Sequence, residues 1–144
     1  QDVRVRFESA PALPRIPGSK DLLQQMLLNL ILNAADAMGG QGDIVIRCDR
    51  SRRLPAEVVL SPAPADEYLE LAVQDSGCGI EPENLPRIFE PFFTTKAFSA
   101  RRGTGLGLSM VYQFAKELGY GLHVQSTVGQ GSTFTILIPL TKGT

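Results

Sequence analysis

Glycines alternate with other residues in the stretch RRGTGLGLS, which runs from Arg101 to Ser109 and places glycine at Gly103, Gly105 and Gly107. Glycine lets a backbone approach a ligand without an intervening side chain. An amphipathic segment, 106–118, follows directly, and the start of a helix offers unpaired N–H groups and positive partial charge. The stretch therefore predicts a phosphate site. A flexible hinge would use glycines as well, so other parts of the chain must support this interpretation.

A second informative segment is the predicted helix 19–38, which Ser19 can cap and Gly39 and Gly40 end. Its polar residues fall within roughly 80° of one another on a helical wheel, and the remaining circumference is almost entirely apolar. These residues are Gln25, Asn29, Asn33 and Asp36. Carboxamide oxygens are hard ligands that suit a hydrated cation. The alternative is the solvated edge of a core helix, but Asn prefers caps and turns.

Two further stretches carry paired glycines. Asp75 follows a predicted strand and opens DSGCGI, where Gly77 and Gly79 predict a tight turn that allows close backbone approach. A simple Asx-type turn explains the same residues. GQGSTF, with Gly129 and Gly131, predicts the hairpin turn between the last two strands. Any functional content of that second stretch is expected in Thr133.

Composition limits the function classes. The chain has 144 residues, 43% of them apolar, and a net charge of -1, which fits one globular domain and argues against a nucleic-acid surface. Asn29 interrupts the longest apolar stretch, 26–32, and no signal peptide is evident. Cys48 and Cys78 match neither a disulfide framework nor a zinc site, so both are expected as free thiols in a reducing compartment. The opening strand-like residues suggest a piece of a longer protein.

Periodicity predicts the order of the elements. Strands are expected at 3–7, 43–49, 68–74, 121–127 and 132–139, and helices at 19–38, 83–88 and 106–118. A long hairpin loop covers 50–67, and the stretch 90–102 has no clear period and is expected to be mobile. Paired strands with segregated helices favour an α+β two-layer α/β sandwich over a doubly wound parallel sheet.

With these motifs in order, the chain resembles the ATP-binding catalytic domain of sensor histidine kinases. The matching stretches are NLILNAADA (29–37), DSGCGI (75–80), IFEPFFTTK (88–96), GTGLGLS (103–109) and GQGSTF. The family belongs to the GHKL (Bergerat-fold) superfamily of chaperone, topoisomerase and mismatch-repair ATPases. The motif sequences of this chain are most similar to those of nitrogen-regulation-type and PAS-linked kinases. The resemblance implies a mixed, mostly antiparallel sheet backed by about three helices. It also implies a mobile ATP lid at about 90–105, and that 1–144 forms this domain alone, without the dimerisation and phosphoacceptor domain.

The resemblance also implies roles for individual residues. Asn33 would coordinate Mg²⁺, Asp75 would accept a hydrogen bond from the adenine amino group, and Lys96 would hold phosphates. Asn29 and Lys96 are the expected catalytic residues. The family's tyrosine four positions after the magnesium ligand is replaced by Ala37, which puts stacking on the base from that side in doubt. The expected nucleotide contacts are Asn29, Asn33, Asp36, Asp75, Gly77, Gly79, Ile80, Thr95, Lys96, Gly103, Thr104, Gly105, Leu106, Gly107, Leu108 and Thr133.

The implied activity is transfer of the γ-phosphoryl group of Mg-ATP to a histidine on a separate dimerisation domain of a two-component sensor kinase. Implied partners are that domain, a response regulator receiver domain and a second copy of the full-length protein, with no nucleic acid. This domain is expected in the cytoplasm, and the same location is expected if the parent protein is anchored in a membrane. Alternatives are an ATP-hydrolysing relative, an anti-sigma-type serine kinase and a catalytically silent nucleotide-binding module. The hydrolase and the serine kinase expect an acidic residue at or near Asn29.

The single histidine, His123, lies on the polar face of a predicted strand, where a solvated surface residue is expected. The chain alone is therefore expected to bind Mg-ATP without phosphorylating itself.

Overall fold

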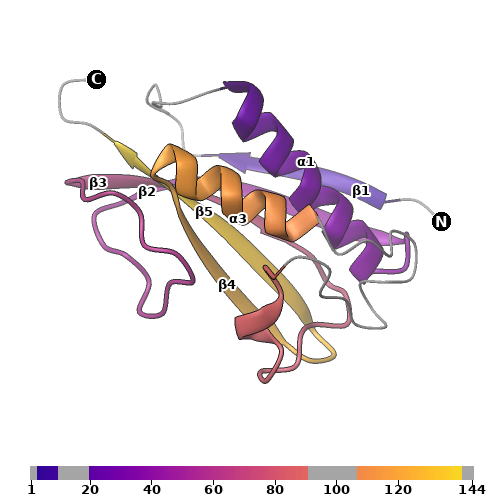
Figure 1. The fold of residues 1–144 in the computed structure, drawn as a ribbon. Coiled ribbons are helices and arrows are strands. Elements are labelled where there is room, and N and C mark those ends of the chain that lie inside the picture. Colours follow the sequence, from indigo (N-terminus) through magenta and orange to yellow (C-terminus); the bar gives the residue numbers. More distant parts are fainter. Residues whose placement is uncertain (1–2, 10–19, 91–106, 141–144) are drawn as a thin grey trace.

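The structure, a computed structural model, describes residues 3–9, 20–90 and 107–140. It contains one five-stranded sheet with two α-helices packed on one of its faces (Figure 1). The elements are β1 (Val3–Ser9), α1 (Lys20–Ala37), β2 (Gly42–Ser51), β3 (Glu67–Gln74), the 3-10 helix η1 (Leu85–Arg87), α3 (Gly107–Leu118), β4 (Gly121–Thr127) and β5 (Gly131–Leu140). The predicted two-layer α+β architecture is confirmed.

The sheet has the strand order β1-β2-β3-β5-β4. β1 pairs with β2 in parallel, whereas the β2–β3, β3–β5 and β4–β5 pairs are antiparallel. The mixed, mostly antiparallel sheet is thus as predicted. The expected number of about three helices needs a correction, because the described residues contain two α-helices and one short 3-10 turn. Pro86, in the first turn of η1, lacks the N–H that a longer helix would use.

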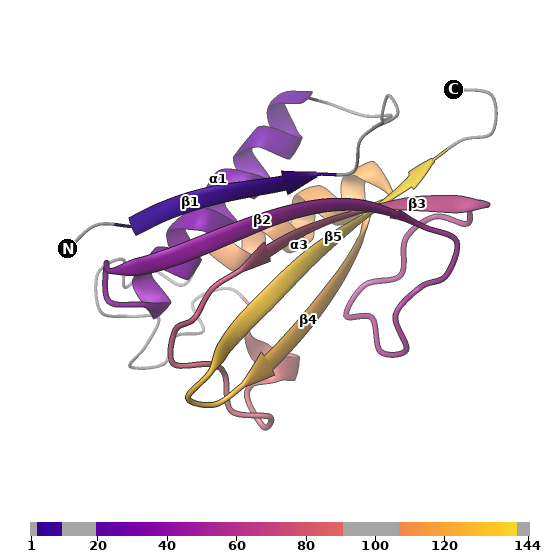
Figure 2. The ribbon, with the colours of Figure 1, turned by 180° about the vertical axis from the view of Figure 1, so that it is seen from behind.

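Alternating side chains of the sheet form the core together with the two helices. Leu69, Leu71 and Val73 of β3 face the helices, as do Phe134, Ile136 and Ile138 of β5, and Met26 and Leu30 of α1 and Val111 of α3 pack against them. Seen from behind, the sheet lies in front of both helices (Figure 2). No helix in the described ranges is long and apolar enough to cross a membrane.

The connection between β2 and β3 reaches the far edge of the sheet. Leu60 forms an isolated antiparallel bridge with Leu122 of β4, and the Ala63 N–H donates to the Gly119 carbonyl at 2.9 Å. The predicted hairpin is present, because β2 and β3 pair as neighbours. Its loop, however, partly covers the β4 edge of the sheet, which otherwise exposes unpaired backbone groups.

Candidate functional site

The polar side of α1 contacts the first residue of α3. Asn29 is only 7% exposed, and its side-chain nitrogen Nδ2 donates to the carbonyl oxygen of Gly107 at 3.3 Å. The side-chain oxygen Oδ1 of Asn29 accepts from Nε2 of Gln25, also at 3.3 Å. The structure therefore brings the asparagine-rich helix and the end of the glycine-rich GTGLGLS stretch together. The unpaired N–H groups of the first turn of α3 begin at this contact.

Asn33 and Asp36 follow Asn29 along α1. Residues three and four positions apart share one side of a helix, and both side chains are partly exposed. The carboxamide oxygen of Asn33 is thus available on the same side as Asn29. Magnesium keeps several of its waters and needs only one or two protein ligands. The chemistry of this donor fits such an ion.

The buried acid of the site is Asp75, directly after β3. Its side chain is 5% exposed, and Oδ1 accepts hydrogen bonds from the backbone N–H of Gly77 at 2.8 Å and of Ser132 at 3.3 Å. Oδ2 is also buried and has no hydrogen-bond partner among the described residues. Burial raises the pKa of Asp75, and the two backbone donors oppose that shift. A buried acceptor without a donor fits a ligand that brings an N–H group.

The glycines of DSGCGI let the loop pack closely against other backbone segments of the chain. A Cβ on Gly77 would lie 2.6 Å from the carbonyl oxygen of Ala37, at the end of α1. A Cβ on Gly79, whose φ is +79°, would clash with the Thr127 carbonyl. The bond from Gly77 to Asp75 is also the Asx-type turn that sequence alone allowed. These two glycines therefore hold the loop between α1 and the β4–β5 hairpin.

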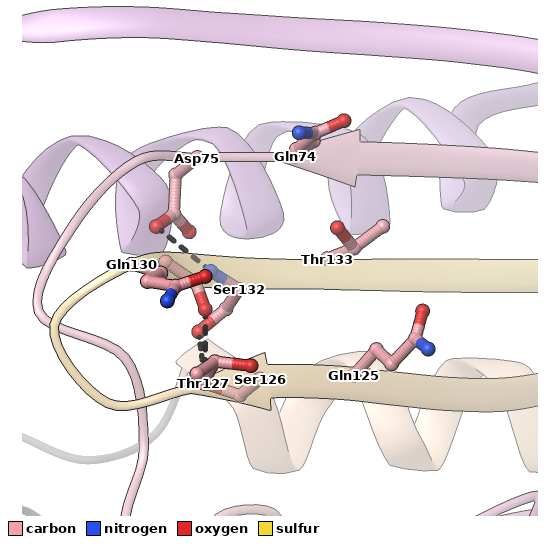
Figure 3. A pocket seen from close by; sticks show the side chains of 9 residues that line it. Gln74, Asp75, Gln125, Ser126, Thr127, Gln130, Ser132 and Thr133 are labelled. Carbon is pink, nitrogen blue, oxygen red and sulfur yellow. Dashed lines mark hydrogen bonds between the residues drawn. The ribbon is translucent and has the colours of Figure 1, made fainter.

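Thr133 lies on the outer face of the sheet. Directly opposite residues of neighbouring strands point to the same face, so Thr133 shares the outer face with Gln74 and Gln125. Its neighbour Phe134 belongs to the helix-facing core, and Ser132 lies beside Asp75 instead (Figure 3). Strand alternation turns the side chain of Thr133 outward, and its contact with a nucleotide base stays a prediction.

Ile80, the last residue of the loop, does lie with the cluster. It is 3% exposed, and its backbone N–H donates to the Ser126 hydroxyl at 2.7 Å. Ser126 and Ser132 were not singled out from sequence. The signal that identifies them is strand alternation. An inward Phe134 on β5 requires an inward Ser132, and an inward Val124 on β4 requires an inward Ser126.

An open cavity of about 210 Å³ lies at the hairpin end of the sheet (Figure 3). Its lining is rich in uncharged polar side chains and includes no residue of α1. The lining residues are Gln74, Asp75, Gln125, Ser126, Thr127, Gln130, Gly131, Ser132 and Thr133.

The remaining predicted site residues lie largely outside the described ranges. Gly107 and Leu108 begin α3, with Leu108 buried. Of the predicted lid, 90–105, only Glu90 is described. Those outside are Thr95, Lys96, Gly103, Thr104, Gly105 and Leu106.

Comparison with known proteins identifies the family of this chain. The profile of the histidine kinase-, DNA gyrase B-, and HSP90-like ATPase family matches residues 18–142. The sensor histidine kinase ZraS of Salmonella typhi is 38% identical over 140 residues, which are 97% of this chain and 26% of ZraS. The chain thus spans about a quarter of that relative's length.

Two solved structures have the same fold. Full-length ShkA in complex with AMPPNP superposes with a TM-score of 0.75 at 25% identity, over 98% of this chain and 26% of ShkA. The catalytic domain of histidine kinase ThkA has a TM-score of 0.72 at 28% identity, over 96% of this chain and 80% of that domain. The chain belongs to the family of histidine kinase-, DNA gyrase B-, and HSP90-like ATPases, as an ATP-binding catalytic domain of the sensor histidine kinase type.

Proposed function

We propose that this chain binds Mg-ATP and transfers its γ-phosphoryl group to a histidine on a separate dimerisation domain of a two-component sensor kinase. The observation that carries the proposal is the buried Oδ2 of Asp75, which has no donor among the described residues. The 6-amino group of adenine supplies a donor for this atom. Guanine places an oxygen there, so two acceptors would face each other and the base would be rejected.

The phosphates and the ion belong, in this proposal, to the other end of the site. Asn33 offers the oxygen ligand for Mg²⁺, and the first turn of α3, at Gly107 and Leu108, offers N–H groups to phosphate. Lys96 and Asn29 are the proposed catalytic residues, because phosphoryl transfer depends mainly on positioning and charge stabilisation. The further proposed contacts are Asp36, Gly77, Gly79, Ile80, Thr95, Gly103, Thr104, Gly105 and Leu106.

The contacts of Asn29 favour phosphotransfer over hydrolysis. A hydrolase of this superfamily needs a general base on water, and an amide takes up no proton at neutral pH. The Asn29 amide is also already used, since it donates to Gly107 and accepts from Gln25. Water activation by this residue is therefore disfavoured.

The proposed partners follow from the same activity. The acceptor histidine belongs to a dimerisation domain of the parent protein, which acts as a homodimer and passes the phosphoryl group to a response regulator receiver domain. The domain works in the cytoplasm, where ATP is available.

Calorimetric titration with ATP tests the nucleotide site. Replacing Asp75 by Ala removes the acceptor, and the affinity is expected to fall about 5- to 150-fold, which corresponds to the ~1–3 kcal/mol cost of an unpaired buried polar group. Asp43→Ala is the matched control, because Asp43 is an exposed acid at the start of β2. The thermal unfolding of each variant shows that it is folded. An unchanged affinity of folded Asp75→Ala would remove Asp75 from the site.

A further inference from the structure

The hydroxyl of Ser126, near the end of β4, contacts three different groups. It accepts from the Ile80 N–H at 2.7 Å, lies 2.8 Å from the Ser132 hydroxyl, and is 3.2 Å from the Gly131 carbonyl oxygen. The pair of hydroxyls is drawn in Figure 3. Ser126 is therefore a junction between the glycine loop and the β4–β5 hairpin.

Counting protons and lone pairs assigns the direction of these bonds. A serine hydroxyl has one proton and two lone pairs. Ser126 can satisfy all three partners only if it accepts from Ile80 and from Ser132 and donates to Gly131. The three bonds then use its full capacity. An alanine at this position would leave the Ile80 N–H and the Ser132 hydroxyl each without this partner.

The two serines link both ends of the glycine loop. At the first end, the Ser132 N–H donates to Oδ1 of Asp75 at 3.3 Å, and the Asp75 N–H donates to the Ser132 carbonyl at 2.9 Å. At the second end, Ile80 is bound directly by Ser126. Ser132 is 5% exposed, so water has little access to replace the bond between the hydroxyls.

We propose that Ser126 is a positioning residue for adenine recognition, holding Ser132 and Ile80 so that the Asp75 carboxylate keeps its place. The proposal rests on the proposed nucleotide function and adds a residue outside the motifs to it. Asp75 discriminates between bases only if its free oxygen stays where an amino group can reach it. Loss of the Ser126 hydroxyl therefore weakens the selective contact and leaves the phosphate contacts unchanged.

The test compares substitutions that differ in the hydroxyl alone. Ser126→Thr keeps it, and Ser126→Val replaces it with a methyl group of nearly the same shape, while both β-branched residues suit a strand. Ser126→Ala is the simplest deletion. Thr135→Ala is the control, since Thr135 of β5 lies on the outer face opposite His123 and does not line the cavity. Calorimetric Kd values for ATP and GTP are measured for each variant, with thermal unfolding to show that it is folded.

We expect Ser126→Ala and Ser126→Val to weaken ATP binding about tenfold, the equivalent of one buried hydrogen bond, and to leave GTP binding unchanged. The preference for ATP over GTP then falls by the same factor, whereas Ser126→Thr and Thr135→Ala keep it. A purely structural role would lower the unfolding temperature without changing that preference. The proposal is overturned if folded Ser126→Val keeps the parental preference, or if the Thr and Val variants behave alike.

The experiments distinguish a failure of the Ser126 proposal from a failure of the proposed function. If the unmodified domain binds no ATP, or if Asp75→Ala binds as well as the parent, the nucleotide function itself fails. If Asp75→Ala weakens ATP binding and the Ser126 variants do not, only the role of Ser126 is refuted.

Discussion

Two opposite effects act on the pKa of the Asp75 carboxylate. Burial disfavours its charge and raises its pKa, while the N–H groups of Gly77 and Ser132 support the charged form at Oδ1. Oδ2 is buried and has no donor among the described residues. A bound amino group would stabilise the carboxylate and lower its pKa again. Nucleotide binding and ionisation of Asp75 are therefore linked.

This linkage predicts a pH dependence with two opposite signs. Because the pKa of Asp75 in the fold lies above its unfolded value, the free domain gains stability as pH falls through the folded pKa. ATP affinity changes in the other direction, since a protonated oxygen accepts the adenine amino group less well. Calorimetry and urea unfolding between neutral pH and about pH 4 measure both effects. The Asp75→Asn variant, which cannot titrate, is the control. A ratio of parent to Asp75→Asn affinity that does not vary with pH would contradict the linkage.

A second acid has a raised pKa for a different reason. Glu70 of β3 lies directly opposite Asp49 of β2, and partial burial together with this neighbouring charge raises the pKa of Glu70. Like charges directly opposite in a ladder destabilise a sheet. We expect Glu70→Gln to raise the free energy of unfolding at neutral pH by about 0.2–1 kcal/mol. The gain should vanish as pH falls through the raised pKa toward its ordinary value of 4.5.

The control for this prediction is another acid of the same strand. Glu67 pairs with Arg50 through an N–O contact of 2.6 Å, which holds the pKa of Glu67 below its usual value. Glu67→Gln removes an attraction and is expected to lower stability. If urea unfolding shows Glu70→Gln to be less stable than the parent, the repulsion is not the dominant effect at that position.

At the scale of elements, one amide links the two helices. Asn29 of α1 donates to the carbonyl of Gly107, the residue at which α3 begins. In Asn29→Asp the shape is kept, but a carboxylate cannot donate and its charge is buried. We expect the free energy of unfolding to fall by about 1–3 kcal/mol, measured in urea. Gln24→Glu makes the same chemical change on the exposed side of α1 and should be nearly neutral. Equal effects of the two variants would show that Asn29 is not a structural link.

Local patterns predicted the regular elements well, because period and burial coincide in them. The alternation of DIVIRC and YLELAV predicted β2 and β3, and the polar stripe on 19–38 predicted a helix with one polar side. The same alternation, extended two residues back from Phe134, places Thr133 outward and Ser132 inward.

Other features depend on contacts between distant parts of the chain. The bridge from Leu60 to Leu122 joins a loop to a strand edge far along the chain, and no local pattern marks it. The closeness of Gly77 to Ala37 likewise arises only when the loop packs on the end of α1. The helix predicted at 83–88 is only the 3-10 helix η1, Leu85–Arg87, in the structure. Pro86 lacks the N–H group that a longer helix would need there. Such features need the tertiary structure.

At the scale of the whole molecule, the proposed phosphate end of the site and the single histidine of the sequence lie on opposite sides of the sheet. His123 lies on the outer face of β4, in register with Thr135, whereas Asn29 lies on α1 on the other side of the sheet (Figures 1 and 2). Partial burial lowers the pKa of His123, although Glu57 opposes the shift. The sheet separates this imidazole from the proposed phosphate end of the site. The chain is therefore expected to need an acceptor from elsewhere.

Phosphotransfer in trans tests this account most directly. The chain is incubated with γ-labelled Mg-ATP, alone and with the phosphoacceptor domain of its parent kinase, and acid-labile, alkali-stable label is followed in each polypeptide. The account predicts no such label on this chain alone and label on the acceptor domain when both are present, with Asp75→Ala reducing the rate. Label on His123 at the rate of an intact kinase, or none on the acceptor domain although ATP is bound, would contradict it.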